Sequence, residues 1–524
     1  MREEKKKQKE LEKAAKKAEK AARQAQNAAA AAGIGAVVAA VRFLSVEDPP
    51  SAIFGPYEMM QSACGVDGSG REFVRVEDVT AQMVGQRVWI RARLATKQAK
   101  GKAAFLVLRQ VRSTIQVTIF DSEELPKTLL KWVKDLTTES VVDVLGDVVS
   151  AEVRSCTQSD VEIQCQRIYC VSKAKQPPFR LEDAARPDAE EGVHVLRDTR
   201  LDDRVLDLRV PAHKSIMRIQ SGVCQIFREA LLERDFIEIH SPKLIAGTSE
   251  GGADVFETDY FGRKACLAQS PQLYKQMAIC GDFERVFEIG PVFRAERSNT
   301  HRHLCEFVGL DFEMTILDHY YEIVRIIDHL FVSIFDGLQR RHALDLATIG
   351  AQYPFEPLRY RKAGENLILQ FHEGIRMLRE DGVEIEDFSD LNTEQEKRLG
   401  KLVREKFDTD FYFLTRFPSA IRPFYTMPEA GNSRYSNSFD VFMRGEEIIS
   451  GAQRIHDPEL LAKRAEECGI DVDTIRDYIK AFSFGAPPHG GAGVGLERVV
   501  MLLLAISNIR ECSLFPRDPQ RLTP

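Results

Sequence analysis

Charged side chains gather in the stretch "FRAERSNTHRHLCEF", residues 293–307, and apolar segments flank it on both sides. On an extended strand, Arg294 and Glu296 point to one face, while Phe293 and Ala295 point to the other. A solvated loop would account for the charges but not for the flanking segments "RVFEIGPV" and "VGLDFEM". The stretch therefore predicts polar chemistry held on a rigid backing.

The alternation that follows predicts the second strand of a hairpin. One face of this strand is mostly polar and contains Phe307, Gly309, Asp311 and Glu313; the other contains Val308, Leu310, Phe312 and Met314. The hairpin would present Arg294, Glu296 and Asp311, and its loop "RSNTHRHL" would add Arg302 and His303. An alternative is a solvent-facing side of a sheet with cross-strand ion pairs.

A second hairpin is predicted in "SFDVFMRGEEIISGAQR", residues 438–454. A two-residue turn at Arg444 and Gly445 would place Asp440 and Glu447 on one face. Two such carboxylates can share Mg²⁺, which completes its coordination with phosphates and water. Arg454 lies at an odd spacing from Glu447, so a regular strand would point the two side chains to opposite faces. A bulge would bring them to the same face, and we expect it at Gly451.

The segment "GGAGVGLERVVMLLLAI" predicts a buried helix with Arg498 in its first turn. A guanidinium at a helix start suits a polyphosphate, although a structural ion pair is the alternative for this residue. The glycine pattern alone is weak support for dinucleotide binding.

A pocket for a small substrate is predicted around "AQSPQLYKQMAI". Ser270 is a good N-cap and Pro271 a good first helical residue, so Gln272 and Lys275 would share one helix face. The glycine-flanked loop "GTSEGGADVF" contributes Ser249 and Glu250 and can approach a ligand closely. A carboxylate and an ammonium suit an amino acid with an acidic side chain.

The elements that position these residues belong to a multi-domain chain. Its 524 residues are 44% hydrophobic, which predicts at least two domains. A net charge of −7 excludes a wholly basic nucleic-acid coat. The ten cysteines form no CxxC pair, which favours reduced thiols over zinc or disulfides. No apolar run has transmembrane length and the charged N-terminus is unlike a signal peptide, so we expect a cytoplasmic protein without membrane contact.

Composition predicts a mixed α/β (α+β) chain. Five short strand patterns in residues 75–172 suit a small barrel of the oligonucleotide-binding kind, an OB-fold. The N-terminal 30 residues are interpreted either as a solvated tail or as a basic helix that steers RNA phosphates. The predicted division is a Lys/Ala-rich helical or disordered extension at 1–30, a linker at 31–74, the barrel at 75–172, a hinge at 173–205 and a catalytic domain at 206–524.

Several motifs together resemble the class II aminoacyl-tRNA synthetases. The segments "FIEIHSPKL", "FRAE" with "RHL", and "GLER" are similar to motif 1 (near 236–244), motif 2 (285–314) and motif 3 (490–505). "SEGGADVF", "QSPQLYKQ" and "RGEEIISGAQRIHDP" resemble the aspartyl-tRNA synthetase family in its eukaryotic cytosolic form, and the similarity extends to the ending "LFPRDPQRLTP". The resemblance implies a catalytic domain built on an antiparallel sheet flanked by helices. It also implies activation of L-aspartate with ATP and transfer to tRNA(Asp), with Mg²⁺ as cofactor.

The resemblance also implies roles for individual residues. Arg294, Arg498 and Glu447 would be catalytic, and Asp440 with Glu447 would hold the metal. The ATP-binding set would be Arg294, Ala295, Glu296, Arg302, His303, Leu304, Phe307, Glu447, Gly495, Leu496, Glu497 and Arg498. The aspartate-binding set would be Ser249, Glu250, Gln272, Lys275, Asp311, Ser450 and Arg454. In the barrel, Phe105 would stack on an anticodon base while Gln116 and Glu162 read base edges, although a phenylalanine in a strand is more often core.

Other readings stay open at this point. An asparaginyl-tRNA synthetase or an ATP-dependent asparagine-forming ligase would share the ATP site. A non-catalytic RNA-binding scaffold is disfavoured because Arg294, Glu447, Arg454 and Arg498 are all present. By resemblance we expect an isologous homodimer, and membership of a multi-synthetase complex is left open. Arg297 and Cys305 depart from the family pattern of motif 2.

Overall fold

We describe the chain from a computed structural model, whose described residues are 53–57, 71–122, 125–246 and 255–524. The extension predicted at residues 1–30 lies outside them, as do Ser249 and Glu250. The chain divides into two compact units, Met1–Pro178 and Phe179–Pro524, so the division falls within the stretch expected to be a hinge. Within the described ranges, no helix has both the length and the apolar character needed to cross a membrane.

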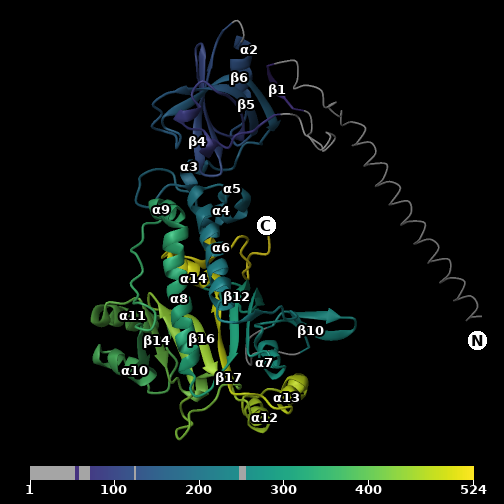
Figure 1. Ribbon diagram of the computed structural model, residues 1–524, viewed down its shortest axis with the longest axis vertical. Helices are drawn as coiled ribbons and strands as arrows, with labels where there is room; N and C mark the ends of the chain where they lie inside the picture. The colour runs from purple at the N-terminus through teal and green to yellow at the C-terminus, as the bar shows by residue number, and fades with distance from the viewer. Residues whose placement is uncertain (1–52, 58–70, 123–124, 247–254) are drawn as a thin grey trace, which may run out of the picture. The chain divides into compact units, whose positions relative to one another are not determined.

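The first unit contains the predicted five-stranded barrel (Figure 1). β2 pairs with β3 and β5, β3 pairs with β4, and β6 closes the barrel against β4 and β5. Ile90, Ala92 and Leu94 alternate into the core from β2, and α2 adds Leu129 and Val133 to it. The OB-fold expectation is confirmed. The elements are β1 (Phe54–Pro56), β2 (Arg87–Lys100), β3 (Ala103–Gln110), β4 (Ser113–Phe120), α2 (Lys127–Asp135), β5 (Val141–Ser150) and β6 (Val161–Ser172).

The second unit is built on an eight-stranded sheet in the order β13-β14-β15-β16-β17-β12-β11-β7. Only its two edge pairings, β13 with β14 and β11 with β7, are parallel, so the predicted antiparallel sheet is confirmed. A small separate sheet contains β8, β10 and β9. The strands are β7 (Ile237–Glu238), β8 (Leu244–Ile245), β9 (Glu257–Tyr260), β10 (Arg263–Leu267), β11 (Arg285–Phe293), β12 (Glu306–Thr315), β13 (Leu367–Gln370), β14 (Phe411–Thr415), β15 (Ser438–Met443), β16 (Glu446–Gln453) and β17 (His489–Gly495).

Helices flank this sheet (Figure 1). Its apolar face, which includes Leu310, Phe312 and Met314, shares one core with α6, α8 and α14. On the opposite face, Tyr412 and Leu414 at one end of the sheet pack with α10 and α11. The helices are α3 (Leu181–Ala184), α4 (Arg197–Asp202), α5 (Arg204–Asp207), α6 (Pro211–Leu232), α7 (Gln272–Cys280), α8 (Tyr321–Arg341), α9 (Ala343–Gln352), α10 (Phe371–Glu380), α11 (Thr393–Phe407), α12 (Pro458–Glu467), α13 (Arg476–Phe482) and α14 (Leu496–Leu503).

The first predicted hairpin is present, with one correction to its first strand. β11 pairs with β12 and ends at Phe293, so Arg294 and Glu296 lie just beyond the strand rather than on it. The backbone N–H of Arg294 still donates to the carbonyl of Cys305, at 2.9 Å. Both faces of β12 are buried over residues 309–314, so the alternative of a solvent-facing sheet side is wrong.

The second predicted hairpin is also present, but its bulge is not where the sequence suggested. Arg444 and Gly445 form the turn with φ of 50° and 77°, and Phe442 pairs with Glu447. Ile449 pairs with Val441, so the extra residue is Ile448 and not Gly451. Gly451 pairs regularly and is small for another reason, since a Cβ there would lie 2.3 Å from Cζ of Phe439.

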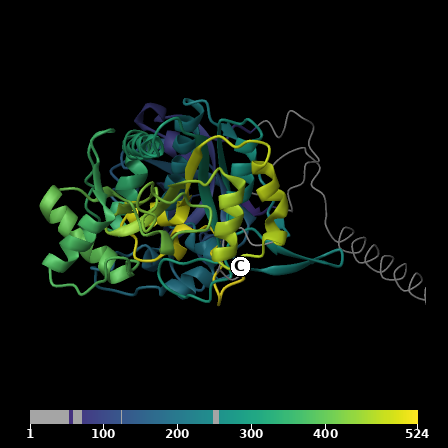
Figure 2. The same ribbon diagram turned by 90° about the horizontal axis from the view of Figure 1, so that it is seen from below.

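An arm formed by β9 and β10 projects from the body of the second unit in both views (Figure 1 and Figure 2). Its turn exposes Tyr260 and Phe261, and the Phe261 side chain is 90% exposed. Ile237 on edge strand β7 and Leu244 on β8 are also exposed. Apolar side chains in such places mark a surface suited to a partner.

Candidate active site

A cavity of about 390 Å³ lies over the polar face of the sheet in the second unit. β11, β12, β16, β17 and the start of α14 all contribute side chains to it. Most of the predicted site residues line this cavity: Gln272, Arg294, Glu296, Arg302, His303, Leu304, Phe307, Asp311, Glu447, Ser450, Arg454, Gly495, Glu497 and Arg498. Ala295, Lys275, Asp440 and Leu496 are described but do not line it.

The bulge at Ile448 explains how β16 serves this cavity. It reverses the alternation of the strand, so that Glu447 before it and Ser450 and Arg454 after it all reach the same space. The sequence predicted that a bulge was needed for Arg454, and the structure supplies it three residues earlier than expected.

One end of the cavity is strongly positive. Arg294 lies with its guanidinium 5.8 Å from the ring of Phe307, and Arg498 donates to the carbonyls of Glu447 at 3.3 Å and Arg302 at 3.4 Å. Burial and the nearby Arg498 lower the pKa of His303, so the positive charge at neutral pH comes from the arginines. Burial also lowers the pKa of Arg498. A bound polyanion would relieve the cost of holding this guanidinium away from water.

Asp440 and Glu447 form an anionic pair beside this positive end. Burial, with the Glu447 charge as a further contribution, raises the pKa of Asp440 well above its usual range. Asp440 Oδ2 accepts from Arg422 at 2.7 Å, while its Oδ1 is buried without a hydrogen-bond partner. An unpaired buried carboxylate oxygen fits a cation ligand. No group of three or more His, Cys, Asp or Glu in the described ranges could hold a metal alone, so a cation there would need further ligands.

The other end of the cavity is a buried network of two cations and two carboxylates. Arg454 donates to Glu313 through Nε at 2.8 Å and Nη2 at 3.3 Å. Lys275 Nζ lies 3.1 Å from Asp311 Oδ1 and 3.4 Å from Glu313 Oε2. Burial would raise the pKa of Glu313, but Arg454 and Lys275 outweigh it and lower that pKa. Arg454 Nη1 has no hydrogen bond within the described part of the chain.

Two glycines of β17 make room for these carboxylates. A Cβ at Gly491 would lie 2.1 Å from the carbonyl oxygen of Phe312 and 2.5 Å from Glu313 Oε2. A Cβ at Gly493 would lie 3.0 Å from Asp311 Oδ1. The glycine run therefore forms the floor of a carboxylate-lined pocket and not a dinucleotide loop.

Helix α7 begins at Gln272 with Pro271 at the N-cap, one residue later than predicted from Ser270 and Pro271. The Ser270 hydroxyl still accepts from the N–H of Gln272 at 3.3 Å, and Gln272 and Lys275 lie at the start of the helix. Both side chains are buried.

Sequence reasoning missed three residues of this site. Arg422 lines the cavity and donates to Ser450 Oγ at 2.9 Å as well as to Asp440. Glu396 on α11 accepts from Arg302 at 2.9 Å, and burial raises its pKa. Glu313 was placed on the correct strand face but given no role. Only Glu313 carried a signal, since it shares alternation with Asp311; Arg422 and Glu396 lie in segments without a distinctive pattern.

The predicted anticodon residues lie together on one outer face of the barrel in the first unit. Gln116 and Glu162 are paired across β4 and β6, and the Gln116 amide donates to Glu162 Oε2 at 2.7 Å. Phe105 is 39% exposed and meets Phe120 edge to face, with ring centroids 6.4 Å apart. The reading of Phe105 as a core residue is therefore wrong, and its exposed ring suits base stacking.

Antiparallel strands with an arginine after the first, a carboxylate pair on a second hairpin and an arginine opening the next helix are the arrangement typical of class II aminoacyl-tRNA synthetases. Family models agree: "tRNA synthetases class II (D, K and N)" matches residues 196–519, and "OB-fold nucleic acid binding domain" matches residues 88–171.

Similar proteins of known name indicate which amino acid specificity within this class the chain resembles. The human cytoplasmic aspartate–tRNA ligase is 52% identical over 487 residues, which cover 92% of this chain and 96% of the relative. Aspartate–tRNA ligase 1 of Arabidopsis thaliana is 54% identical and covers 87% of each chain. A putative aspartyl-tRNA synthetase from Leishmania major matches in structure with a TM-score of 0.85 and 44% identity, covering 90% of this chain and 98% of that one. Asparaginyl-tRNA synthetase from Pyrococcus horikoshii, complexed with asparaginyl-adenylate, matches with a TM-score of 0.75 but only 28% identity, covering 86% and 100%. The chain belongs to the aspartate–tRNA ligase family of class II tRNA synthetases.

Proposed function

We propose that this chain activates L-aspartate with ATP and transfers the aspartyl group to the terminal ribose of tRNA(Asp) in the cytoplasm. Family membership supports the reaction class, and the cytoplasmic relatives support the location. The observation that carries the choice of amino acid is the cation pair Arg454 and Lys275 over the floor of the cavity.

The aspartate side chain is held by charge and geometry. Arg454 lines the cavity with Nη1 available, and Lys275 lies behind it on the same network. A guanidinium can pair with both oxygens of a carboxylate. Asparagine presents an amide in the same place and leaves these buried cations poorly matched, which disfavours it by several kcal/mol, on the order of an unpaired buried charge. The same network disfavours the asparaginyl alternative. Gln272 and Ser450 complete the walls, and Ser249 and Glu250 are assigned to the amino group by resemblance.

In the first step, an oxygen of the substrate α-carboxylate forms a bond to the α-phosphorus of ATP and the bond to pyrophosphate breaks. The attacking carboxylate is already ionised, so no side chain has to remove a proton. Arg294 neutralises charge on the α-phosphate, and Arg498 holds the γ-phosphate at the other end. Arg302, His303, Glu296 and Phe307 surround the nucleotide.

Mg²⁺ would be held by Asp440 and Glu447 together with phosphate oxygens. The orphaned Asp440 Oδ1 and the raised pKa of that carboxyl fit such a ligand, because a cation would replace the missing partner. The bound metal would neutralise charge on the phosphates. Arg422 pairs with Asp440 at 2.7 Å and offsets part of its charge.

Two further partners follow from the surface. Phe105, Gln116 and Glu162 on the barrel suit an exposed anticodon, by stacking and by edge hydrogen bonds. The exposed apolar side chains of the β9–β10 arm and of Ile237 and Leu244 suit a second copy of the chain, which makes a homodimer the proposed assembly.

The experiment that tests the activity is ATP–pyrophosphate exchange with L-aspartate and L-asparagine measured separately. We expect exchange with aspartate alone, followed by aminoacylation of tRNA(Asp) and not of tRNA(Asn). Exchange only with asparagine would overturn the proposal.

A further inference from the structure

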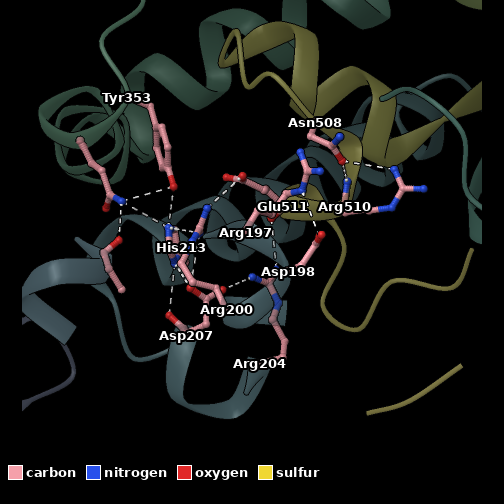
Figure 3. Close-up of polar contacts among 12 residues, drawn as sticks. Arg197, Asp198, Arg200, Arg204, Asp207, His213, Tyr353, Asn508, Arg510 and Glu511 are labelled. Carbon is pink, nitrogen blue, oxygen red and sulfur yellow. Dashed lines mark hydrogen bonds and ion pairs between the residues drawn. The ribbon is translucent and has the colours of Figure 1, made fainter. Parts of the chain in front are cut away.

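Two sequence features have no part in the reaction as described: the hinge stretch "DTRLDDRVLDLR" and the ending "LFPRDPQRLTP". In the structure they meet around the short turn Ile509–Cys512 (Figure 3). Residues 508–518, called here the C-terminal segment, lie between the hinge helices α4 and α5 and the loop of motif 2.

The hinge side of the C-terminal segment is fixed by buried arginines. Arg200 donates to Glu511 Oε1 at 3.1 Å, and Arg204 donates to the carbonyls of Glu511 at 3.2 Å and Ser513 at 2.6 Å. Asp207 pairs with both arginines and with His213, whose ring also contacts the Tyr353 hydroxyl at 2.7 Å. Figure 3 shows these side chains converging from separate elements. A network of this kind is rigid, because the loss of any member would leave a buried charge unpaired.

The other side of the C-terminal segment is fixed to the motif 2 loop by Arg510. This side chain is 94% buried, and it donates to the Thr300 carbonyl at 2.9 Å and to Asn299 Oδ1 at 2.5 Å. Asp518 holds its Nε at 2.5 Å. The neighbouring backbone adds two bonds, from Ile509 N–H to the His301 carbonyl and from Cys305 N–H to the Arg517 carbonyl, both at 2.8 Å.

The motif 2 loop needs this support because it has almost no regular structure of its own. Residues 294–304 form no helix or strand, yet Arg302, His303 and Leu304 must line the cavity. The planar guanidinium of Arg510 fixes two loop atoms in one geometry, which a lysine could not do. If the loop is already ordered before ATP binds, no binding free energy is spent on ordering it, and ATP binds more tightly.

We propose that Arg510 is a positioning residue that holds the motif 2 loop in its ATP-binding form, and that the ion pair of Glu511 with Arg200 anchors it to the hinge. The inference rests on the proposed function, in which this loop contacts ATP. Arg510 itself touches no substrate. Its loss weakens ATP binding and leaves the aspartate pocket unchanged.

The test uses the full chain with Arg510→Gln and a matched control, Arg521→Gln. Arg521 belongs to the same ending and pairs with Asp202 of α4 at 2.7 Å. Its other hydrogen bonds within the described residues are with Thr523 and Asp518, not with the loop. In ATP–pyrophosphate exchange, we expect Arg510→Gln to raise KM for ATP by about tenfold or more, with kcat changed by less than about threefold and KM for aspartate unchanged. Hydrogen–deuterium exchange without ATP should rise in residues 297–304 for this variant only.

A second variant, on the loop itself, distinguishes loss of the Arg510 contact from general misfolding of Arg510→Gln. Asn299 is exposed, so Asn299→Ala removes one bond to Arg510 without disturbing the buried network, and it should raise KM for ATP in the same direction by a smaller factor. An unchanged KM for ATP in both Arg510→Gln and Asn299→Ala would overturn the inference, as would an equal rise in Arg521→Gln. The two proposals can fail separately. If the wild-type chain does not activate aspartate but Arg510→Gln still shows faster deuterium uptake in the loop, the proposed function is refuted and the role of Arg510 in holding the loop stands.

Discussion

Replacing Glu313 by glutamine gives the sharpest test of the buried charge network. Glu313 is fully buried and lies between Arg454 and Lys275, at 2.8 Å and 3.4 Å. Glutamine keeps the shape but leaves two buried cations facing Asp311 alone. Removal of one partner from a buried ion pair costs about 3–5 kcal/mol, so we expect a loss of that size in the free energy of unfolding.

The pH dependence of this loss has a definite sign. Arg454 and Lys275 lower the pKa of Glu313 in the folded state despite its burial, so the unfolded chain takes up the proton first as the pH falls. The stabilisation is therefore complete above the unfolded pKa and is lost as the pH falls through the folded one. The difference between wild type and Glu313→Gln should shrink below about pH 4.3, the ordinary pKa of glutamate.

The substrate supplies a second part of this test. L-aspartate would bring a carboxylate to Arg454, which lines the cavity in front of Lys275, so it should restore part of the lost stability, whereas L-asparagine should not. Urea unfolding with and without saturating ligand measures both effects. Glu229→Gln, which removes the partner of Arg341 on the exposed surface of α6, is the control and should change little. The reasoning is refuted if Glu313→Gln is as stable as wild type, or if aspartate stabilises both proteins equally.

Three further predictions concern separate parts of the molecule. Arg498→Ala should reduce ATP–pyrophosphate exchange by about 10²–10³-fold or more while tRNA binding is retained; persistent exchange would remove its phosphate role. Burial raises the pKa of Glu497 to about 7, so the folded chain loses stability as the pH rises from the unfolded pKa to that value. In urea unfolding, wild type should lose on the order of 3 kcal/mol of its free energy of unfolding between pH 5 and 8, and Glu497→Gln should not. The same pH dependence in both proteins would contradict this. Phe105→Ala should weaken tRNA binding by about 1–3 kcal/mol without changing exchange, and an unchanged affinity in a filter-binding assay would leave the ring without a stacking role.

Local periodicity predicted much of the fold. Alternation separated Asp311 from Leu310 on β12, and the two-residue turn predicted at Arg444 and Gly445 is present, with positive φ at both residues. Alternation cannot show which residue of a strand forms a bulge, however. The bulge was expected at Gly451, but it lies at Ile448, and Gly451 is a glycine because the Phe439 ring leaves no room for a side chain there.

The rest of the site depends on contacts between residues far apart in the chain. Arg294 lies just beyond β11, and the loop that follows it contacts a segment more than 200 positions later in the chain, which no local sequence pattern indicates. Lys275 was expected to meet the substrate directly, but it lies behind Asp311 and Glu313 as part of a neutralised network. Arg422 reaches the cavity from a loop, and Glu396 on α11 contacts the cavity residue Arg302; the sequences of both segments resemble ordinary surface.

The glycine floor of β17 has a consequence for how this pocket can evolve. A methyl group at Gly493 would crowd Asp311, and one at Gly491 would collide with Glu313 and with the backbone of Phe312. A side chain at Gly493 would require the Asp311 carboxylate to shift by a few tenths of an ångström, whereas the backbone of Phe312 closes Gly491 to any side chain. A change of amino acid preference that alters this floor therefore has to involve β12 as well, because both facing carboxylates lie on that strand.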